Sequence, residues 1–402
     1  MASLLWGKVY YHDLFVGYVR EEPGDSISFN YDKSYIEGGY PAIAHTLPVR
    51  SEPYISNYGL HPFFDNLVSE GWLERLQSRL LGRRIVSRFE LLLAFGFDCA
   101  GAVSIYDPKP SDLSKSMLDM SNPKELAVLT NRASLSGVQP KLAVIEEDGI
   151  YRPTRIGELS THIAKFPTPA HPDLIENEYL TTVAFKALIP KDEIVQLTID
   201  EVLGLDESAL LIRRFDRSSE GRLHFEEYNQ LLNRRSQTKY DGSYKDMAKF
   251  LLETSGCLPT QVYILYRRIL AGLLMGNTDM HLKNFAMFHT RDGLRLTPSY
   301  DQIAASLYDY KTLALTIAGS KDHPIGDLKS RHLVLLGKEF GLSPAVINMA
   351  TMDLAKNREA TKDTINEAPF GAKKLRDKLI KLMDKRWNGT FNLIGKALSK
   401  KQ

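Results

Sequence analysis

The chain has 402 residues, of which 43% are hydrophobic and 25% charged, and its net charge at pH 7 is +2. This length suits two or three domains, and the ordinary composition excludes a disordered or fibrous class. The apolar runs, such as residues 269–275, are far too short to span a bilayer, and the N-terminus lacks a signal-peptide pattern, so we expect no membrane association.

A meander of antiparallel strands is predicted at the N-terminus, over residues 4–36. Apolar and polar side chains alternate along this stretch. Turn signals at His12-Asp13 and at residues 22–25 divide it into short strands.

Two helices and a linker are predicted next. Residues 63–81 carry apolar side chains at helical spacing and end before Gly82, and residues 88–95 predict a second helix. Residues 107–122 are rich in Pro, Ser, Asp and Lys and poor in large apolar groups, which indicates a linker. We therefore expect residues 1–106 to form a small first domain.

A loop with two serines follows the linker. Residues 134–141 read Ser-Leu-Ser-Gly-Val-Gln-Pro-Lys, and strands are predicted after them over residues 142–145, 150–153 and 161–166. With one glycine, the loop is neither a G-x-G-x-x-G nor a Walker A motif. The hydroxyls of Ser134 and Ser136 are suited to bind phosphate or to accept it. A turn without further function is the alternative, because serine is common in turns.

Lys165 lies at the end of the third of these strands. A lysine on a strand beside a phosphate-covering loop is the expected partner of the α- and β-phosphates of a nucleotide. Taken alone, Lys165 would be a surface lysine at a strand end. The order of loop, strand, turn, strand and lysine favours the nucleotide role.

The octapeptide 277–284, Asn-Thr-Asp-Met-His-Leu-Lys-Asn, places Asp279 five residues before Asn284. Protein-kinase catalytic loops use this spacing, with an Asp that orients and deprotonates a hydroxyl and an Asn that binds Mg²⁺. A structural turn is the alternative, because Asp and Asn are frequent in turns and caps.

The elements around the octapeptide favour a metal site. In order, they are an apolar helix over residues 260–275 with Gly276 as its stop, a strand over 284–289, a turn at Asp292-Gly293 and a return strand over 294–297. Such a hairpin returns Tyr300-Asp301 to the start of its first strand, so we expect Asn284 and Asp301 to meet in space. Their oxygen atoms suit a hard cation that also binds substrate phosphates.

The C-terminal residues 371–402 are basic, with ten Lys or Arg and two Asp, hence a charge of +8, so the rest of the chain carries −6. A basic helix can contact nucleic acid or an acidic partner. We favour an amphipathic helix instead, because no aromatic residues interleave the lysines of residues 373–385. Its core-facing residues would be Leu375, Leu379, Leu382 and Met383.

Two cysteines, Cys99 and Cys257, are too few for a disulfide framework. We expect reduced thiols in a cytoplasmic protein.

These motifs together resemble those of HipA-type serine/threonine kinases, the toxin half of bacterial HipA–HipB toxin–antitoxin pairs. The resemblance covers nearly the whole chain. The segments that carry it are residues 47–48, 63–67 and 101–103, the loop 134–141, the strand 161–165, the segment 213–217, the octapeptide 277–284 and Tyr300-Asp301.

The resemblance implies an α+β fold, in which a small N-terminal α/β domain precedes a bilobal protein-kinase-like fold with a largely helical C-terminal lobe. We place the kinase N-lobe, with its hinge, at residues 123–217 and the C-lobe at 218–402. The roles it implies are a catalytic base at Asp279, Mg²⁺ ligands at Asn284 and Asp301, an ATP-phosphate contact at Lys165, adenine contacts from the backbone of Arg213 to Phe215, and a position near the nucleotide for His281.

The resemblance also implies autophosphorylation of a serine in the loop, which displaces the loop and switches the kinase off. Ser134 matches the modified position better, but Ser136 offers a second hydroxyl, and either or both remain possible acceptors. The addition of about two negative charges beside anionic phosphates would repel ATP or expel the loop.

A cation near the transferred phosphoryl group is missing from its usual place. Eukaryotic kinases have Lys two residues after the base, whereas this chain has His281 there and Lys283 two residues later. Either can supply the charge, His281 only when protonated. A solvated loop lysine is the alternative for Lys283.

The resulting hypothesis is an ATP- and Mg²⁺-dependent protein serine/threonine kinase, a toxin that phosphorylates a translation-related protein such as an aminoacyl-tRNA synthetase. A HipB-like antitoxin would be its partner, and DNA would be bound indirectly, through that antitoxin. There are two alternatives from other classes. One is a binding module that raises the affinity of an antitoxin for DNA, and the other is a small-molecule kinase.

Overall fold

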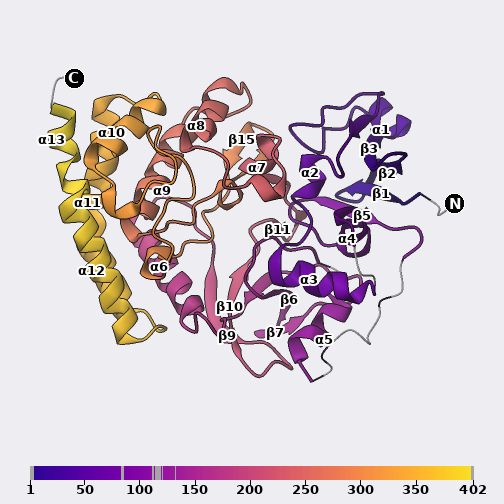
Figure 1. Ribbon diagram of the computed structural model, residues 1–402, viewed down its shortest axis with the longest axis horizontal. Coiled ribbons are helices and arrows are strands. Elements are labelled where there is room, and N and C mark those ends of the chain that lie inside the picture. The colour runs from indigo at the N-terminus through magenta and orange to yellow at the C-terminus, as the bar shows by residue number, and fades with distance from the viewer. Residues whose placement is uncertain are drawn as a thin grey trace. The chain divides into compact units, whose positions relative to one another are not determined.

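The computed structural model describes residues 4–82, 86–110, 113, 119, 121–131 and 133–399 (Figure 1). Residue contacts divide the chain into two units, one of Met1–Pro172 with Leu197–Thr238 and one of Asp173–Gln196 with Lys239–Gln402. Of the predicted linker, residues 111, 112, 114–118 and 120 lie outside the described residues.

The first unit begins with the predicted antiparallel meander, which the structure confirms. Its strands are β1 (Trp6–Tyr11), β2 (Leu14–Glu22) and β3 (Ser26–Tyr31), and β4 (Tyr54–Ser56) and β5 (Val103–Tyr106) complete a five-stranded sheet in the order β4-β3-β2-β1-β5. The turns contain His12 and Asp25 with φ of 51° and 61°. Buried and half-buried residues alternate along β1, because one face of the sheet covers the core.

The helix predicted over residues 63–81 is wrong as a single element. The chain forms α2 (Pro62–Asp65) and α3 (Gly71–Leu80), separated by a bend, whereas α4 (Arg88–Phe95) has the predicted bounds. The break has a local cause, because Gly71 has a φ of +62° that a continuous helix does not allow. Gly82 follows α3 with a φ of +64°, as expected for a residue after a helix end. Two short helices complete this unit's N-terminal part, α1 (Lys33–Glu37) and α5 (Pro123–Thr130).

A second five-stranded sheet lies in the same unit, in the order β7-β6-β8-β10-β9. Its strands are β6 (Lys141–Glu147), β7 (Ile150–Pro153), β8 (His162–Lys165), β9 (Leu197–Glu201) and β10 (Ser208–Arg213). The three strands predicted after the serine loop are thereby confirmed. Shorter elements follow: β11 (Arg217–Ser218), β12 (Gly221–Arg222), β13 (Phe225–Glu227) and α7 (Tyr228–Leu231).

The second unit is largely helical. Its helices are α6 (Leu174–Leu188), α8 (Tyr244–Glu253), α9 (Gln261–Met275), α10 (Ser330–Glu339), α11 (Pro344–Glu367), α12 (Lys373–Gly389) and α13 (Ile394–Ser399). The helix α6 packs against α11 and α9, although the predicted bounds placed it with the N-lobe strands. Those bounds remain a prediction. No helix within the described residues is long and apolar enough to cross a membrane.

The basic C-terminal stretch forms the amphipathic helix that we favoured. Leu375, Leu379 and Met383 of α12 are buried and Leu382 is half-buried, while most of the lysines face solvent. In Figure 1, α11, α12 and α13 form the yellow end of this unit.

Candidate active site

The octapeptide 277–284 leaves the end of a buried helix. The helix α9 ends at Gly276, whose φ is +78°, and the N–H of Asn277 returns to the carbonyl oxygen of Gly272 at 2.9 Å. A Cβ on residue 276 would meet the side chains of Ser306 and Leu382, so both the conformation and the space require glycine. The loop therefore starts from a fixed point in the core.

Asn277 ties this loop to the segment that contains Asp301. Its side chain is fully buried, and its Oδ1 accepts a hydrogen bond from the backbone N–H of Asp279 at 3.1 Å. Its Nδ2 donates to the carbonyl oxygen of Asp301 and to Oε1 of Gln302, both at 3.3 Å. No local sequence pattern indicated a role for Asn277 or Gln302, apart from a carboxamide directly after a helix-ending glycine.

The predicted hairpin is present and brings its return strand to the loop. The strands β14 (Ala286–Thr290) and β15 (Gly293–Leu296) pair as expected. The hydroxyl of Tyr300 donates to the carbonyl oxygen of Lys283 at 2.8 Å, which places Tyr300-Asp301 beside the end of the octapeptide. Two details of the prediction are wrong. Asn284 lies in a 3-10 turn, Leu282–Asn284, and the strand begins two residues later; the hairpin turn is formed by Arg291 and Asp292, because Gly293 already belongs to β15.

Two backbone features fix the candidate metal ligands. The Nδ2 of Asn284 donates to the carbonyl oxygen of Asp279 at 2.8 Å, which aims its Oδ1 elsewhere. Asp301 has a φ of +54°, an uncommon conformation for a residue with a side chain, and Asn277 holds its carbonyl oxygen.

Asp279 has an aromatic neighbour that the sequence analysis missed. The phenol of Tyr240 donates to Oδ1 of Asp279 at 3.1 Å, and its ring meets the ring of His281 edge-on, with centroids 5.0 Å apart. Tyr240 is about half exposed, whereas Tyr244 four residues later is fully buried. Burial raises the pKa of Tyr244, and the negative charge of Asp279 adds to the effect.

Both candidate cations, His281 and Lys283, are buried. The Nδ1 atom of His281 accepts a hydrogen bond from the backbone N–H of Lys283 at 3.3 Å. The side chain of Lys283 is only 2% exposed. The solvated-lysine alternative is therefore wrong, because this side chain is buried within the loop.

The serine loop and Lys165 lie together in the first unit. Lys165 pairs with Lys141 across strands β8 and β6, and its side chain is 8% exposed, so the surface-lysine alternative is wrong. The loop is anchored to the same strand end, because Phe166 donates its N–H to Pro140 and accepts at its carbonyl oxygen from the side chain of Gln139.

A buried ion network holds the predicted hinge segment. Arg213 is exposed at the end of β10, and the half-buried Phe215 contacts the ring of Phe225. Between them, the guanidinium of Arg214 lies 2.7 Å from Oδ2 of Asp216. Burial works to raise the pKa of Asp216, but the nearby guanidinium groups outweigh it and hold that pKa below its ordinary value.

The network also reaches the N-terminal part of the unit. Arg214 contacts Asp98 at 3.4 Å, and Arg217 contacts the same carboxylate at 2.6 Å. A residue of the first predicted domain thus orders the hinge, which no local pattern indicated.

The predicted site residues form two groups, one in each unit. The first unit holds Ser134, Ser136, Lys165, Arg213 and Phe215, and the second holds Asp279, His281, Lys283, Asn284 and Asp301.

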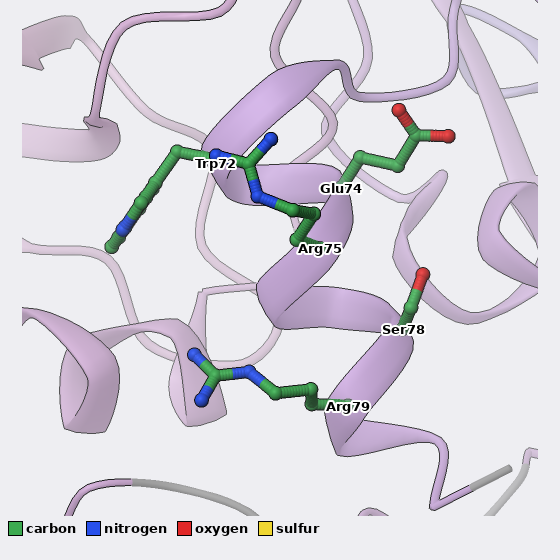
Figure 2. A pocket seen from close by; sticks show the side chains of 5 residues that line it. All are labelled: Trp72, Glu74, Arg75, Ser78 and Arg79. Carbon is green, nitrogen blue, oxygen red and sulfur yellow. The ribbon is translucent and has the colours of Figure 1, made fainter. Parts of the chain in front are cut away.

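A surface hollow of about 560 Å³ lies along α3 and contains none of these residues. Figure 2 shows Trp72, Arg75 and Arg79 extending to one side of the helix and Glu74 and Ser78 to the other. Arg79 pairs with Glu125 at 2.8 Å, which leaves less of its charge for a ligand.

Comparisons with known proteins identify related sequences and a related fold. Residues 7–106 match the model of the HipA N-terminal domain, and residues 133–368, more than half of the chain, match that of the HipA-like C-terminal domain. The chain belongs to the HipA-like family. It is similar to the putative kinase Y4dM of Sinorhizobium fredii, with 29% identity over 373 residues that cover 86% of this chain and 88% of that protein. It is also similar to the serine/threonine-protein kinase toxin HipA of Shewanella oneidensis, with 26% identity and 77% of each chain covered.

The fold agrees with a solved HipA-like structure. The chain superposes with a TM-score of 0.75 on HipA from the Shewanella oneidensis MR-1 complex of HipA, HipB and operator DNA, at 21% identity, with 98% of this chain and 99% of that chain covered. The predicted α+β, kinase-like fold class of this HipA-like protein is therefore confirmed.

Proposed function

We propose that this HipA-like protein is an ATP- and Mg²⁺-dependent protein serine/threonine kinase, the toxin of a toxin–antitoxin pair. The observation that carries the proposal is the link made by Asn277, which holds Asp279 and Asp301 in one hydrogen-bonded unit beside Asn284. A base and two oxygen ligands held in fixed register are what phosphoryl transfer requires of a protein.

The donor set fits a hard cation. Asn284 uses its Nδ2 on the backbone and so presents Oδ1, and Asp301 offers a carboxylate. When bound, Mg²⁺ neutralises charge on the phosphates of ATP. These two side chains would hold it; Asn284 is bound to the backbone of its own loop, and the backbone of Asp301 is held by the side chain of Asn277.

Each remaining residue has a defined role in this proposal. Asp279 orients the acceptor hydroxyl and takes its proton, and Lys165 binds the ATP phosphates. Lys283 or, when protonated, His281 supplies the positive charge near the transferred group. The backbone of Arg213 and Phe215 meets the adenine.

The regulation and partners complete the proposal. Autophosphorylation at Ser134, Ser136 or both displaces the loop and switches the kinase off. The substrate is a translation-related protein such as an aminoacyl-tRNA synthetase. The similarity to a HipA bound with HipB and operator DNA supports a HipB-like antitoxin as partner and, as a second function, a corepressor role on DNA through that antitoxin.

Incubation of the purified protein with ATP and Mg²⁺, followed by mass-spectrometric mapping of phosphosites, tests the kinase assignment. We expect phosphate in the 134–141 loop of the wild type and none in Asp279→Asn. Equal phosphate content in both proteins would show that Asp279 is not the base.

A further inference from the structure

A short segment of the N-terminal domain, the clasp, contacts the serine loop. It consists of residues 67–70, which lie between α2 and α3, and Gly71, the first residue of α3. The hydroxyl of Ser134 donates to the carbonyl oxygen of Leu67 at 2.5 Å, and its oxygen lies 3.1 Å from that of Ser69. Ser134 is only 4% exposed, so the loop is closed in this conformation.

The backbone of the loop is held by the same segment. Gly71 packs so closely on Val138 that a Cβ at residue 71 would run into the Val138 backbone. The hydroxyl of Ser69 accepts from the N–H of Leu135 at 3.2 Å. The clasp therefore contacts the loop at both its start and its middle.

Glu70 places a buried carboxylate at the centre of these contacts. It is 8% exposed, its Oε1 accepts from the hydroxyl of Ser236 at 2.7 Å, and the hydroxyl of Ser136 donates to the same oxygen at 3.4 Å. On the other side of the loop, the ammonium of Lys141 donates to the carbonyl oxygen of Ser136 at 2.8 Å. Ser136 thus lies near one negative and one positive side chain.

We propose that Glu70 is a positioning residue for the serine loop and senses the charge on Ser136. A serine hydroxyl donates to the carboxylate and keeps the loop closed. A phosphoserine has no proton to donate and adds about two negative charges against a carboxylate shielded from water. Repulsion by Glu70 then outweighs attraction by Lys141 and opens the loop.

This inference rests on the proposed autophosphorylation for its biological trigger. In that step, the oxygen of Ser136 bonds to the γ-phosphorus of ATP, the bond from that phosphorus to the β-phosphate oxygen breaks, ADP leaves, and the hydroxyl proton passes to Asp279. The opening itself depends only on charge, so a mimic of phosphoserine tests it without catalysis.

The experiment measures amide hydrogen exchange of residues 134–141 in four full-length proteins: wild type, Ser136→Glu, Glu70→Gln and the double variant. We expect Ser136→Glu to speed exchange of residues 134–141 about tenfold or more. The exchange rate of the double variant should stay within about threefold of that of Glu70→Gln, because the negative charge that repels the new carboxylate is then absent while Lys141 remains nearby. Glu74→Gln is the matched control, since Glu74 lies on α3 and pairs with Arg88. Combined with Ser136→Glu, it should leave the loop open.

The inference would be overturned if Ser136→Glu sped exchange of residues 134–141 equally with and without the Glu70 charge. It would also be overturned if Ser136→Glu sped exchange in neither background. Should Glu70→Gln fail to fold, Ser136→Lys and Ser136→Met provide a second test. Lysine should slow exchange of the loop relative to methionine of similar size, and faster exchange would contradict the proposal. A protein that takes up no phosphate from ATP would refute the kinase assignment and leave these results unaffected.

Discussion

The carboxamide nitrogen of Asn284 donates a hydrogen bond to the backbone carbonyl oxygen of Asp279, 2.8 Å away. One side chain therefore fixes the proposed base loop and, at the same time, orients its own oxygen. This double use explains why a carboxamide rather than a carboxylate suits the position: an aspartate has no N–H to donate to the carbonyl oxygen.

We expect Asn284→Asp to reduce Mg²⁺-dependent phosphate transfer about tenfold, because the hydrogen bond lost to the carbonyl oxygen of Asp279 contributes about 1.4 kcal/mol. Asn284→Ala should reduce it further, about a hundredfold, because the oxygen ligand is also lost. Radiolabelled ATP and titration with Mg²⁺ measure both effects. Asn388→Asp, at an exposed position of α12, is the control and should have no effect. Full activity of Asn284→Ala would refute its role as a ligand.

Asn277→Ala should cost about 2–3 kcal/mol of unfolding free energy, because it removes the three hydrogen bonds of a fully buried side chain. Asp301 would lose its anchor, so a higher Mg²⁺ concentration should be needed for half-maximal activity. Urea unfolding and Mg²⁺ titration give the two quantities. An unchanged Mg²⁺ dependence in a destabilised protein would mean that Asn277 is structural only.

The local part of the site could be predicted from sequence. The spacing of Asp279 and Asn284, the stop at Gly276 and the turn at Asp292-Gly293 act over a few residues, and local geometry follows from such patterns. The return of Tyr300 to the loop followed from them, because a hairpin with a two-residue turn has a fixed register.

The contacts between distant segments could not be predicted. Ser136 meets Glu70, which lies 66 residues away, and Tyr240 meets Asp279 across 39 residues. Periodicity and turn signals carry no information on such pairs. The side chains of the bend at residues 66–70 also serve contacts made elsewhere in the unit, which the predicted helix could not anticipate.

Tyr240→Phe should raise kcat/KM for a protein acceptor about threefold to tenfold. A base must lie about 2.6–3.2 Å from the hydroxyl that it deprotonates, and the phenol of Tyr240 already occupies that position beside Asp279, at 3.1 Å. In Tyr240→Phe, the acceptor hydroxyl no longer has to displace the hydrogen bond from the phenol to Asp279. Transfer of labelled phosphate to an Asp279→Asn copy of the chain measures the effect. Tyr310→Phe, another exposed tyrosine, is the control. A loss of activity in Tyr240→Phe would instead mean that the phenol orients the carboxylate.

The hinge network should make the protein sensitive to acid. Burial works to raise the pKa of Asp216, but Arg214 and Arg217 lower it more, so the folded-state pKa lies below the unfolded value of about 4. The stabilisation is therefore complete above pH of about 5 and is lost as the pH falls through the folded-state pKa.

Asp216→Asn should lower the unfolding free energy at pH 7 by about 3 kcal/mol, since it leaves a buried guanidinium without one of its carboxylates. Between pH 5 and pH 3 the variant should lose less stability than the wild type, and other carboxyl groups with lowered pKa values, such as Asp98 and Glu158, contribute to the remaining loss. Urea unfolding at four pH values, with the exposed Asp377→Asn as control, measures both effects. If the unfolding free energies of the wild type and Asp216→Asn fell in parallel with decreasing pH, Asp216 would not contribute to acid unfolding.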